Sequence, residues 1–343
     1  MHTSDPSLAD LPPPPPGAAG WPWTEGAEPL PETMADGRLW PRISIVTPSF
    51  NQAEYLEETL RSVFLQGYPN LEYLVIDGGS TDGSVEIIER YAPWLSHWVS
   101  EPDRGQSEAI NKGFSRATGR IFAWLNSDDV YYPGALELAA RSLAGRRRKM
   151  IIGAMQKVER QPGGGWRPVR LSSATKGDPL QRYRILKKGP RAEFHFIQPP
   201  MFWTRDLWIR TGGLDERYHY VMDMEWCNRA LAAGGEVETT DTVVSRFALH
   251  DGSKSNDEMD RMRREEALMY WRLGLTPSFR LLPCVLSTLL PIQRTLSIGA
   301  IRSRESGRKL RGGLLASAAR ATKLVRMSVG GDGRLGGRDG NAA

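Results

Sequence analysis

The sequence predicts an α/β protein with a mixed, mostly parallel central sheet flanked by helices. Three observations support this fold class. Short runs of β-branched and apolar residues are typical of buried strands, other segments place apolar residues at helical spacing, and the two kinds of segment alternate. Alternation of this kind is typical of right-handed βαβ units, whose helices cover both faces of the sheet. A chain of 343 residues is long enough for one large domain of this class.

The predicted elements follow one another regularly up to residue 155. Strands are expected at 43–47, 71–76, 121–125 and 150–155, with a short apolar piece at 98–99. Helices are expected between them, with Asn51 as the N-cap of the first, Asp82 near the start of the second and Pro133 in the first turn of a later one. Further on, the sequence predicts a hairpin or loop at 160–173 and helical segments at 204–211, 223–233 and 257–273.

The two ends of the chain differ in composition from this central part. Residues 1–40 are rich in proline and are expected to form a disordered leader. The apolar stretch 279–300 is interrupted by Pro, Gln and Arg, so it lacks the run of about 20 apolar residues that spans a bilayer. Eight Lys and Arg residues against one acid follow between 302 and 326. Residues 327–343 are expected to be a disordered tail.

The C-terminal region, 256–326, therefore has two possible roles. Its helical, basic part from 279 to 326 would either contact an anionic membrane surface or pack against the rest of the chain. The two cysteines form no disulfide framework, which fits a reducing compartment. The expected location is cytoplasmic, either free or peripheral on the inner face of the membrane.

The stretch IFAWLNSDD, residues 121–129, brings two adjacent carboxylates to the end of a predicted strand. Ligands of parallel sheets bind outside the carboxyl ends of the strands, so Asp128 and Asp129 are expected to share a crevice with Asp77 and Asp82. A divalent cation would relieve the repulsion between the carboxylates, and oxygen ligands suit Mg²⁺ or Mn²⁺. The alternative is a solvated turn whose carboxylates cap the next helix.

Five segments in order carry a resemblance to a known family: ISIVTPSFNQ, LEYLVIDGGSTDGS, SEPDRGQSEAINKGFSRATGRIFAWLNSDD, GGLDERYHYVMDMEW and FALHDGSKS. The chain resembles the glycosyltransferase family 2 enzymes, which are inverting sugar transferases with a GT-A fold. The resemblance extends roughly from residue 42 to residue 255. It implies a GT-A catalytic domain at 41–255, between the leader and the C-terminal region.

The resemblance implies a donor site at the strand ends. The implied nucleotide-sugar ligands are Thr47, Pro48, Ser49, Asp77, Asp103, Asn126, Asp128, Asp129 and Lys254. Asp77 would hold the base, although an Asp before two glycines can also simply form a turn. Asn126 stands where the family's D-x-D motif begins and brings no negative charge. Metal binding therefore falls mainly to Asp128, with Asp129 as a helper, and His250 would face the metal or the diphosphate unless it is a structural histidine.

The acceptor side is implied by the later segments. The resemblance places Asp223 at the catalytic base, with Glu225 as a supporting residue or as the base if the register shifts by two. Acidic residues in a first helical turn can also simply favour the helix dipole. Asp215 is the runner-up for the base and more closely resembles a loop-fixing residue. Gln198 and Trp226 are expected either to line the acceptor site or to pack.

The predicted function is a Mn²⁺- or Mg²⁺-dependent inverting transfer of a sugar, by default from a UDP-sugar. The acceptor is expected to be a hydroxyl of a glycan or a lipid-linked molecule in polysaccharide or cell-surface biosynthesis. A sugar-phosphate nucleotidyltransferase is a rival, but the segment TPSFNQ after the first strand lacks the expected basic, Gly-rich phosphate loop. A nucleic-acid-binding protein is another, but the tail after residue 280 contains no Trp or Tyr. No nucleic-acid partner is therefore expected.

Overall fold

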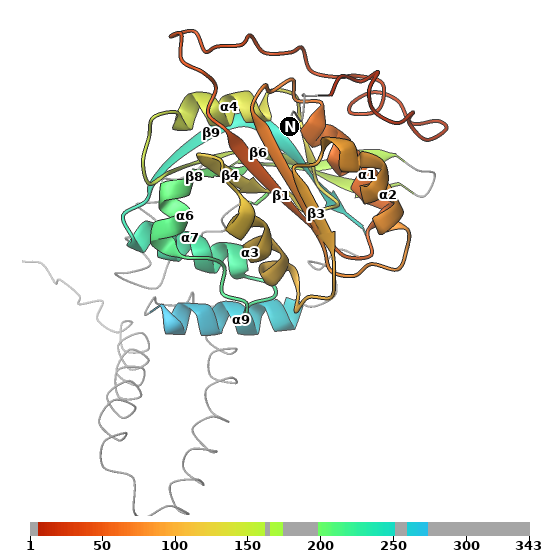
Figure 1. Ribbon diagram of the computed structural model, residues 1–343. Coiled ribbons are helices and arrows are strands. Elements are labelled where there is room, and N and C mark those ends of the chain that lie inside the picture. Colours follow the sequence, from red (N-terminus) through yellow and green to blue (C-terminus); the bar gives the residue numbers. More distant parts are fainter. Residues whose placement is uncertain (1–5, 162–164, 174–197, 251–258, 274–343) are drawn as a thin grey trace, which may run out of the picture. The chain divides into compact units, whose positions relative to one another are not determined.

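A mixed, nine-stranded sheet forms the centre of the described part of the chain (Figure 1). The computed structural model describes residues 6–161, 165–173, 198–250 and 259–273. The strands are β1 (Ile43–Ser49), β2 (Leu71–Asp77), β3 (His97–Ser100), β4 (Ile121–Trp124), β5 (Val130–Tyr131), β6 (Lys149–Arg160), β7 (Trp166–Ser173), β8 (Met201–Thr204) and β9 (Glu236–Leu249). Their order is β3-β2-β1-β4-β8-β6-β9-β5, and β7 pairs with β6.

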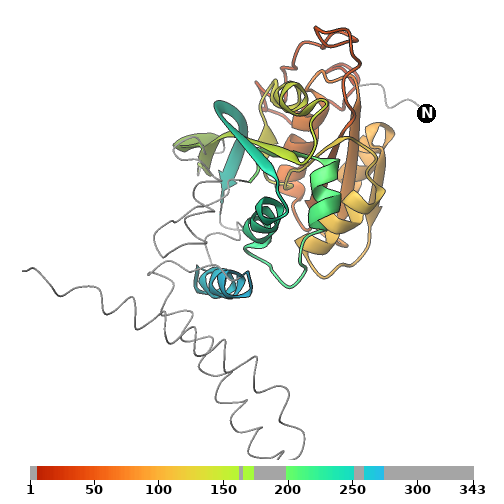
Figure 2. The ribbon, with the colours of Figure 1, turned by 90° about the vertical axis from the view of Figure 1, so that its left-hand side faces the viewer.

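The direction of the strands gives the sheet two different edges. The neighbours β3, β2, β1 and β4 are all parallel. Strand β8 is antiparallel to both β4 and β6, so β6 and its parallel partner β9 point the same way as β1. The hairpin of β6 and β7 extends beside β9 (Figure 2). We call the end of the sheet at which β1, β2 and β4 finish the carboxyl edge. The opposite end, at which β1, β4 and β6 begin, is the amino edge. Both names refer to strand ends and not to the outermost strands.

Helices cover both faces of this sheet. They are α1 (Ala53–Phe64), α2 (Ser84–Tyr91), the 3₁₀ turn η1 (Ala92–Trp94), α3 (Gln106–Arg116), α4 (Ala135–Leu143), α6 (Arg205–Thr211), α7 (Met222–Ala232) and α9 (Met259–Arg272). On one face, Phe64 of α1 packs edge-on against Tyr73 of β2, with ring centroids 5.2 Å apart. On the other face, Trp203 of β8 lies 6.1 Å from Trp208 of α6 and 4.9 Å from Trp226 of α7. The predicted α/β class with covered faces is confirmed.

The start of α1 differs from the prediction. Asn51 has a φ of 50° and does not cap the helix, whose side-chain cap comes instead from a different loop. The Asp82 carboxylate accepts the N–H of Ala53 at 2.9 Å, and it also accepts the N–H of Ser84 at the start of α2 at 3.0 Å. One carboxylate therefore serves the N-termini of two helices, which satisfies donors that would otherwise be unpaired.

The predicted disordered leader is wrong for residues 6–40, which pack against α1 and the sheet. Leu11, Met34 and Trp40 are buried there. The physical reason is Arg61 of α1, whose guanidinium is buried and has its donors directed at the leader backbone. It donates to the carbonyls of Pro12 at 2.7 Å, Pro22 at 3.0 Å and Trp23 at 2.9 Å. Proline removes backbone donors but leaves carbonyls, and these accept the arginine's hydrogen bonds.

We expect Arg61→Ala to lower the free energy of unfolding by roughly 3 kcal/mol, because charge-assisted hydrogen bonds are lost and buried carbonyls are left unpaired. Urea denaturation of the full chain measures this. Arg167→Ala is the matched control, because Arg167 makes an exposed ion pair with Glu159 at 2.5 Å and its loss should change stability by no more than about 1 kcal/mol. Equal stability of the two variants would show that the leader contributes little.

Part of the C-terminal prediction can be compared with the structure. Helix α9 falls within the predicted region 256–326 and buries Ala267, Met269 and Tyr270. Residues 279–326, with their expected membrane contact, and the tail 327–343 lie outside the described residues. Among the helices that are described, none has the length and apolar character to cross a bilayer.

Candidate active site

Asp77 ends β2 at the carboxyl edge, and its buried carboxylate accepts four hydrogen bonds. Oδ2 accepts the N–H groups of Gly79 at 3.0 Å and Ser80 at 2.8 Å, and the hydroxyl of Ser100 at 2.7 Å. Oδ1 accepts the Ser80 hydroxyl at 2.5 Å. The turn-forming geometry is therefore present. The carboxylate is fully enclosed in this structure, but among the described residues Oδ1 accepts only one hydrogen bond and keeps unused acceptor capacity.

Asp103 lies close to Asp77. A Cβ at Gly78 would come within 3.0 Å of the Asp103 carboxylate, so this close approach depends on glycine. Oδ1 of Asp103 accepts the N–H of Gly105 at 2.8 Å. Burial raises the pKa of Asp103, and the negative charge of Asp77 adds to this increase. Two predicted donor residues are thus brought together across the ends of β2 and β3.

The end of β1 supplies the other side of this region. The Thr47 hydroxyl is buried and lies 2.9 Å from the Tyr73 hydroxyl, so its side chain belongs to the core. The buried Ser49 hydroxyl has no hydrogen-bond partner among the described residues. Pro48 lies between them, and its side chain points to the opposite face because strand side chains alternate. Of the three predicted residues, Ser49 has the polar atom best suited to a ligand.

Asn126 is the centre of a hydrogen-bond network that uses both ends of its amide. Oδ1 accepts from Nε2 of Gln106 at 2.6 Å, and Nδ2 donates to Asp129 and to Oε1 of Gln198, both at 3.1 Å. Gln198 in turn donates to the carbonyl of Trp124 at 3.0 Å. An aspartate at position 126 would place a second carboxylate against Asp129. The amide therefore explains the departure from D-x-D and gives Asn126 and Gln198 positioning roles.

Asp129 does not face a ligand. It is 1% exposed, accepts from Asn126 and lies 3.4 Å from the N–H of Ala248. Burial raises the pKa of Asp129 well above its usual value, and the charge of Asp128 raises it further. The expectation that Asp129 helps to bind the metal is not supported, because its carboxylate is enclosed by the fold.

Asp128 and His250 come together from distant parts of the chain. Nε2 of His250 lies 3.1 Å from Oδ2 of Asp128. The His250 ring stacks on Tyr55 of α1, with centroids 4.3 Å apart and planes at 29°. The Asp128 side chain is 21% exposed, whereas that of His250 is 5% exposed. The pair is therefore fixed on its inner side by Tyr55 and open to a ligand at the carboxylate.

Asp128 and His250 offer an oxygen and a nitrogen that fit a divalent cation whose coordination shell is completed by a bound ligand. Among the described residues, no group of three or more His, Cys, Asp or Glu side chains is arranged to hold a metal. Mg²⁺ and Mn²⁺ in phosphate-binding enzymes usually take only one or two protein ligands and complete their shell with phosphate oxygens and water. Asp128 and His250 meet that requirement.

Asp223 lies in the first turn of α7 and is partly buried. Its carboxylate accepts the N–H of Met224 at 2.7 Å, and no side chain of the described residues is bonded to it. Burial raises its pKa to about 6, although the backbone hydrogen bonds act in the opposite direction. A carboxylate with this pKa is ionised at neutral pH and basic enough to take a proton.

Glu225 and Trp226 have structural roles. The Glu225 carboxylate is held at both oxygens by Arg229, at 2.6 Å and 2.8 Å, and Arg229 also donates to the carbonyls of Thr211 and Gly213. The indole of Trp226 is fully buried and donates to the Gly212 carbonyl at 2.9 Å. Glu225 therefore supports α7, and Trp226 belongs to the core.

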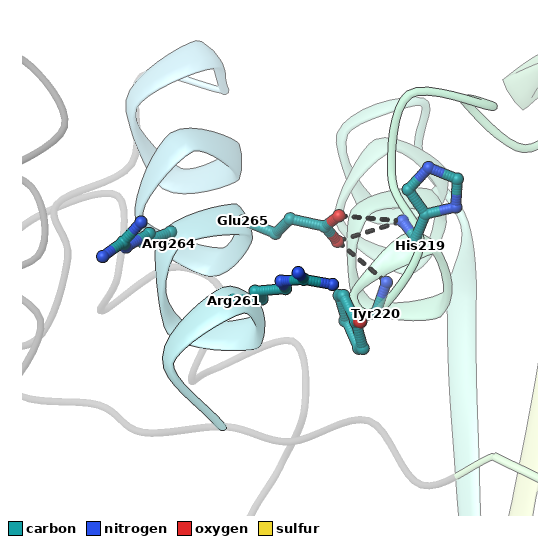
Figure 3. Close-up of a pocket in the computed structure, with 5 residues that line it drawn as sticks. All are labelled: His219, Tyr220, Arg261, Arg264 and Glu265. Carbon is teal, nitrogen blue, oxygen red and sulfur yellow. Dashed lines mark hydrogen bonds between the residues drawn. The ribbon is translucent and has the colours of Figure 1, made fainter. Parts of the chain in front are cut away.

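The loop before α7 is held on two sides. The Ser107 hydroxyl of α3 donates to the carbonyl of Tyr218 at 3.2 Å. Glu265 of α9 accepts the N–H groups of His219 and Tyr220, the latter at 2.8 Å (Figure 3). Arg261 and Arg264 join these three residues in lining a cavity of about 480 Å³. The start of α3 thus positions both this loop and, through Gln106, Asn126.

The remaining predicted residues are placed as follows. Asp215 pairs with Arg217, at 2.8 Å and 2.5 Å, and fixes the loop as expected. Lys254 lies outside the described residues. Sequence reasoning missed Tyr55, Gln106 and Glu265, because each acts through a contact with a segment far along the chain.

Comparison with known proteins gives a consistent assignment. Residues 44–210 match the model of the family described as glycosyl transferase family 2. An uncharacterized glycosyltransferase of Mycobacterium tuberculosis is 37% identical over 108 residues, which are 31% of this chain and 41% of the relative. TuaG of Bacillus subtilis, a glycosyltransferase named for teichuronic acid biosynthesis, is 39% identical over 100 residues, 28% of this chain and 40% of TuaG. The matched part of the chain thus spans about two fifths of each of these two relatives.

A solved structure shares the fold. The crystal structure of S. aureus TarS 1–349 in complex with UDP-GlcNAc superposes with a TM-score of 0.52 and 19% identity, over 66% of each chain. TarS 1–349 without that ligand gives a TM-score of 0.50 at 20% identity. The sheet and helices described above are therefore the GT-A architecture that the sequence resemblance implied. The family model and the curated relatives identify residues 44–210 of this chain as a glycosyl transferase family 2 domain.

Proposed function

We propose that this protein is an inverting glycosyltransferase that moves a sugar from a nucleotide-diphosphate sugar to an acceptor hydroxyl. The observation that carries the proposal is the Asp128–His250 pair at the carboxyl edge, 3.1 Å apart and open to a ligand. The edge also holds Asp77 and Asp103, which suit a nucleoside, and the start of α3 connects it to the loop that carries Asp223.

Each part of the edge has a task in this reaction. Asp77 and the Ser49 hydroxyl offer an acceptor and a donor to the nucleoside, and Phe50, which is 60% exposed beside them, offers a ring face. Asp128 and His250 would hold Mn²⁺ or Mg²⁺. When bound, the cation would neutralise the charge that develops on the leaving diphosphate. Tyr55 keeps His250 in place by stacking on its ring.

Asp223 acts on the acceptor. Its carboxylate takes the hydroxyl proton as the acceptor oxygen bonds to the anomeric carbon and the bond from that carbon to the diphosphate breaks. A single displacement of this kind inverts the anomeric configuration. The cavity beside Tyr220, about 480 Å³, is large enough for a sugar unit and lies next to the start of α7. We propose a glycan or lipid-linked acceptor in polysaccharide biosynthesis, to which the name of TuaG also points.

A donor screen tests the proposal. Purified protein with Mn²⁺ is offered a panel of nucleotide sugars, beginning with UDP-sugars because TarS holds UDP-GlcNAc. We expect nucleotide diphosphate to be released in the presence of acceptor, and the product to have the inverted anomer. A parallel arm offers nucleoside triphosphates and sugar 1-phosphates. Pyrophosphate release in that arm alone would identify a nucleotidyltransferase and overturn the proposal.

A further inference from the structure

The amino edge of the sheet carries a row of arginines that the proposed reaction does not use. Arg42 precedes β1, Arg120 precedes β4 and Arg148 precedes β6, and these three strands point the same way. Arg205 follows β8, which is antiparallel and therefore ends at this same edge. We call the exposed set the basic edge: Arg42, Arg120, Arg146, Arg148, Arg205 and Arg210.

Contacts join these residues into one surface. The N–H of Arg120 donates to the Arg42 carbonyl at 2.8 Å, and the N–H of Arg205 donates to the Arg120 carbonyl at 2.9 Å. The carbonyl of Arg148 accepts the N–H of Glu236 at 2.8 Å, and the Arg210 guanidinium donates to the carbonyl of Ala233, at the turn that precedes Glu236. The basic edge is therefore continuous from β1 to α6.

Two further contacts connect the loop before β6, which carries Arg146 and Arg148, to α6 and to the leader. Arg147 lies 3.7 Å from the carboxylate of Asp206 in α6, and both side chains are mostly exposed. The Arg38 guanidinium lies 3.2 Å from the position that a Cβ at Gly145 would take. The leader segment before β1, the loop before β6 and α6 thus lie side by side.

The charge of the basic edge is not neutralised within the described part of the chain. Arg42 lies 3.6 Å from Glu72, but none of the other five makes an ion pair with a described acid. Arginines in ion pairs are found elsewhere on the same surface: Arg38 bonds to Asp36 and Arg141 to Glu137. The unpaired guanidinium groups leave a positive field that favours an external anion, and arginine binds phosphate well.

Two exposed aliphatic residues are close to these arginines along the chain. Ile209 of α6 is 66% exposed and lies between Arg205 and Arg210 along the chain. Leu39 is 77% exposed and lies three residues before Arg42. Aliphatic side chains add nothing to the binding of a soluble polyanion, and nucleic acids prefer stacked aromatic rings. At a bilayer, in contrast, such side chains enter the apolar layer while arginines contact lipid phosphates.

We propose that the basic edge binds the surface of an anionic bilayer, with Leu39 and Ile209 entering the headgroup layer. This contact is separate from residues 279–326 and does not depend on the proposed reaction. It turns the carboxyl edge toward the aqueous phase, because the two edges are opposite ends of the same strands. The seven residues of β1 separate them by about 20 Å. A lipid-linked acceptor would then have to carry a glycan long enough to reach Asp223.

Vesicle sedimentation of the full chain tests the proposal. The test variant combines Arg120→Gln, Arg146→Gln, Arg148→Gln and Arg205→Gln. The control variant combines Arg104→Gln, Arg167→Gln, Arg217→Gln and Arg263→Gln, four exposed arginines that pair with acids elsewhere. Both variants lose the same charge, and both keep the basic residues of 302–326. Vesicles contain phosphatidylcholine with or without 30% phosphatidylglycerol, a composition chosen for roughly physiological negative charge.

We expect the test variant to bind the anionic vesicles about 1,000-fold more weakly than wild type, because each of its four arginines contributes about 1 kcal/mol near such a surface. The control variant should bind clearly more tightly than the test variant. Equal binding by the test variant and wild type would overturn the proposal. A third variant, Leu39→Ser with Ile209→Ser, should weaken binding to vesicles but not to heparin. If it binds vesicles like wild type while the test variant loses heparin and vesicles alike, the partner is a soluble polyanion instead.

Discussion

Asp223→Asn is expected to slow sugar transfer by about 10²–10⁴-fold, the usual contribution of a general base. The substitution keeps the shape of the side chain and removes its basicity. Donor affinity should barely change, because Asp77 and the Asp128–His250 pair lie at the strand ends and, within the described part of the chain, form no hydrogen bond with Asp223. Initial rates at saturating donor, with donor affinity from calorimetry, separate the two effects.

The pH profile gives a second signature of the same residue. Only the ionised carboxylate accepts a proton, and burial raises the pKa of Asp223 to about 6. The rate should therefore rise with pH through about 6 and then level off, and at pH 5 it should be about a tenth of the plateau value. If the base had the ordinary pKa of an aspartate, the transfer rate would not increase in this way above pH 5. Asp223→Asn should lose this pH dependence as well as most of the transfer activity.

Stability distinguishes a base from a structural carboxylate. A pKa raised on folding means that the folded state favours the neutral form, so this group's contribution to stability declines as the pH rises from about 4 to about 6. Replacement by neutral Asn should then leave the melting temperature at pH 7.5 unchanged or higher. A lower melting temperature together with weaker donor binding would mean that Asp223 is structural or a metal ligand.

Glu225→Gln is the matched comparison within the same helical turn. Glu225 is held by Arg229 at both oxygens, so we expect a loss of stability with transfer largely preserved. If Glu225→Gln is instead inactive and Asp223→Asn is fully active, the base lies two residues further on.

The sequence alone predicted β1, β2, β4 and the first half of β6 and placed a candidate site at the ends of these strands, but it did not predict β8 or β9. β1, β2 and β4 are buried on both faces, so they appear in the sequence as continuous apolar runs, and the ends of parallel strands meet at one edge. That rule brought Asp77 and Asp128 to the same edge from positions 51 residues apart. The closeness of Asp128 and His250 was implied only by family resemblance, because local periodicity does not describe contacts between distant segments.

Sequence reasoning missed the features that depend on which side chain or backbone group the fold brings next to a polar residue. The leader appears disordered by composition, yet its carbonyls satisfy a buried Arg61. The sequence predicts Asp129 as a helper of Asp128 in metal binding, yet its side chain turns inward to Asn126. In each case the composition shows which groups are polar but not which partner the fold supplies.

Asp128→Ala is expected to reduce transfer by at least about 10²–10³-fold and to weaken donor binding in Mn²⁺, while the fold persists. The reason is geometric. Asp128 is the exposed member of the Asp128–His250 pair, and Asp129 is buried and cannot take its place. Asp128→Asn extends the test, because the amide can still bond to His250 but lacks the charge that a cation requires. We expect it to resemble Asp128→Ala in donor affinity and to exceed it in thermal stability.

Calorimetry shows, independently of activity, whether Asp128 binds a cation. Calorimetry with MnCl₂ and nucleotide diphosphate, without sugar or acceptor, should show binding to wild type that is lost in both Asp128 variants and removed by chelator. Asp206→Asn is the control, since Asp206 lies at the opposite edge beside Arg147 and should leave this binding unchanged. Tyr55→Ala should weaken Mn²⁺ binding less than Asp128→Ala and more than Tyr55→Phe, because Phe keeps the ring that stacks on His250. If chelator leaves full transfer activity, or if Asp128→Ala keeps wild-type turnover, the pair serves the donor without a metal, and the cation has to be removed from the mechanism.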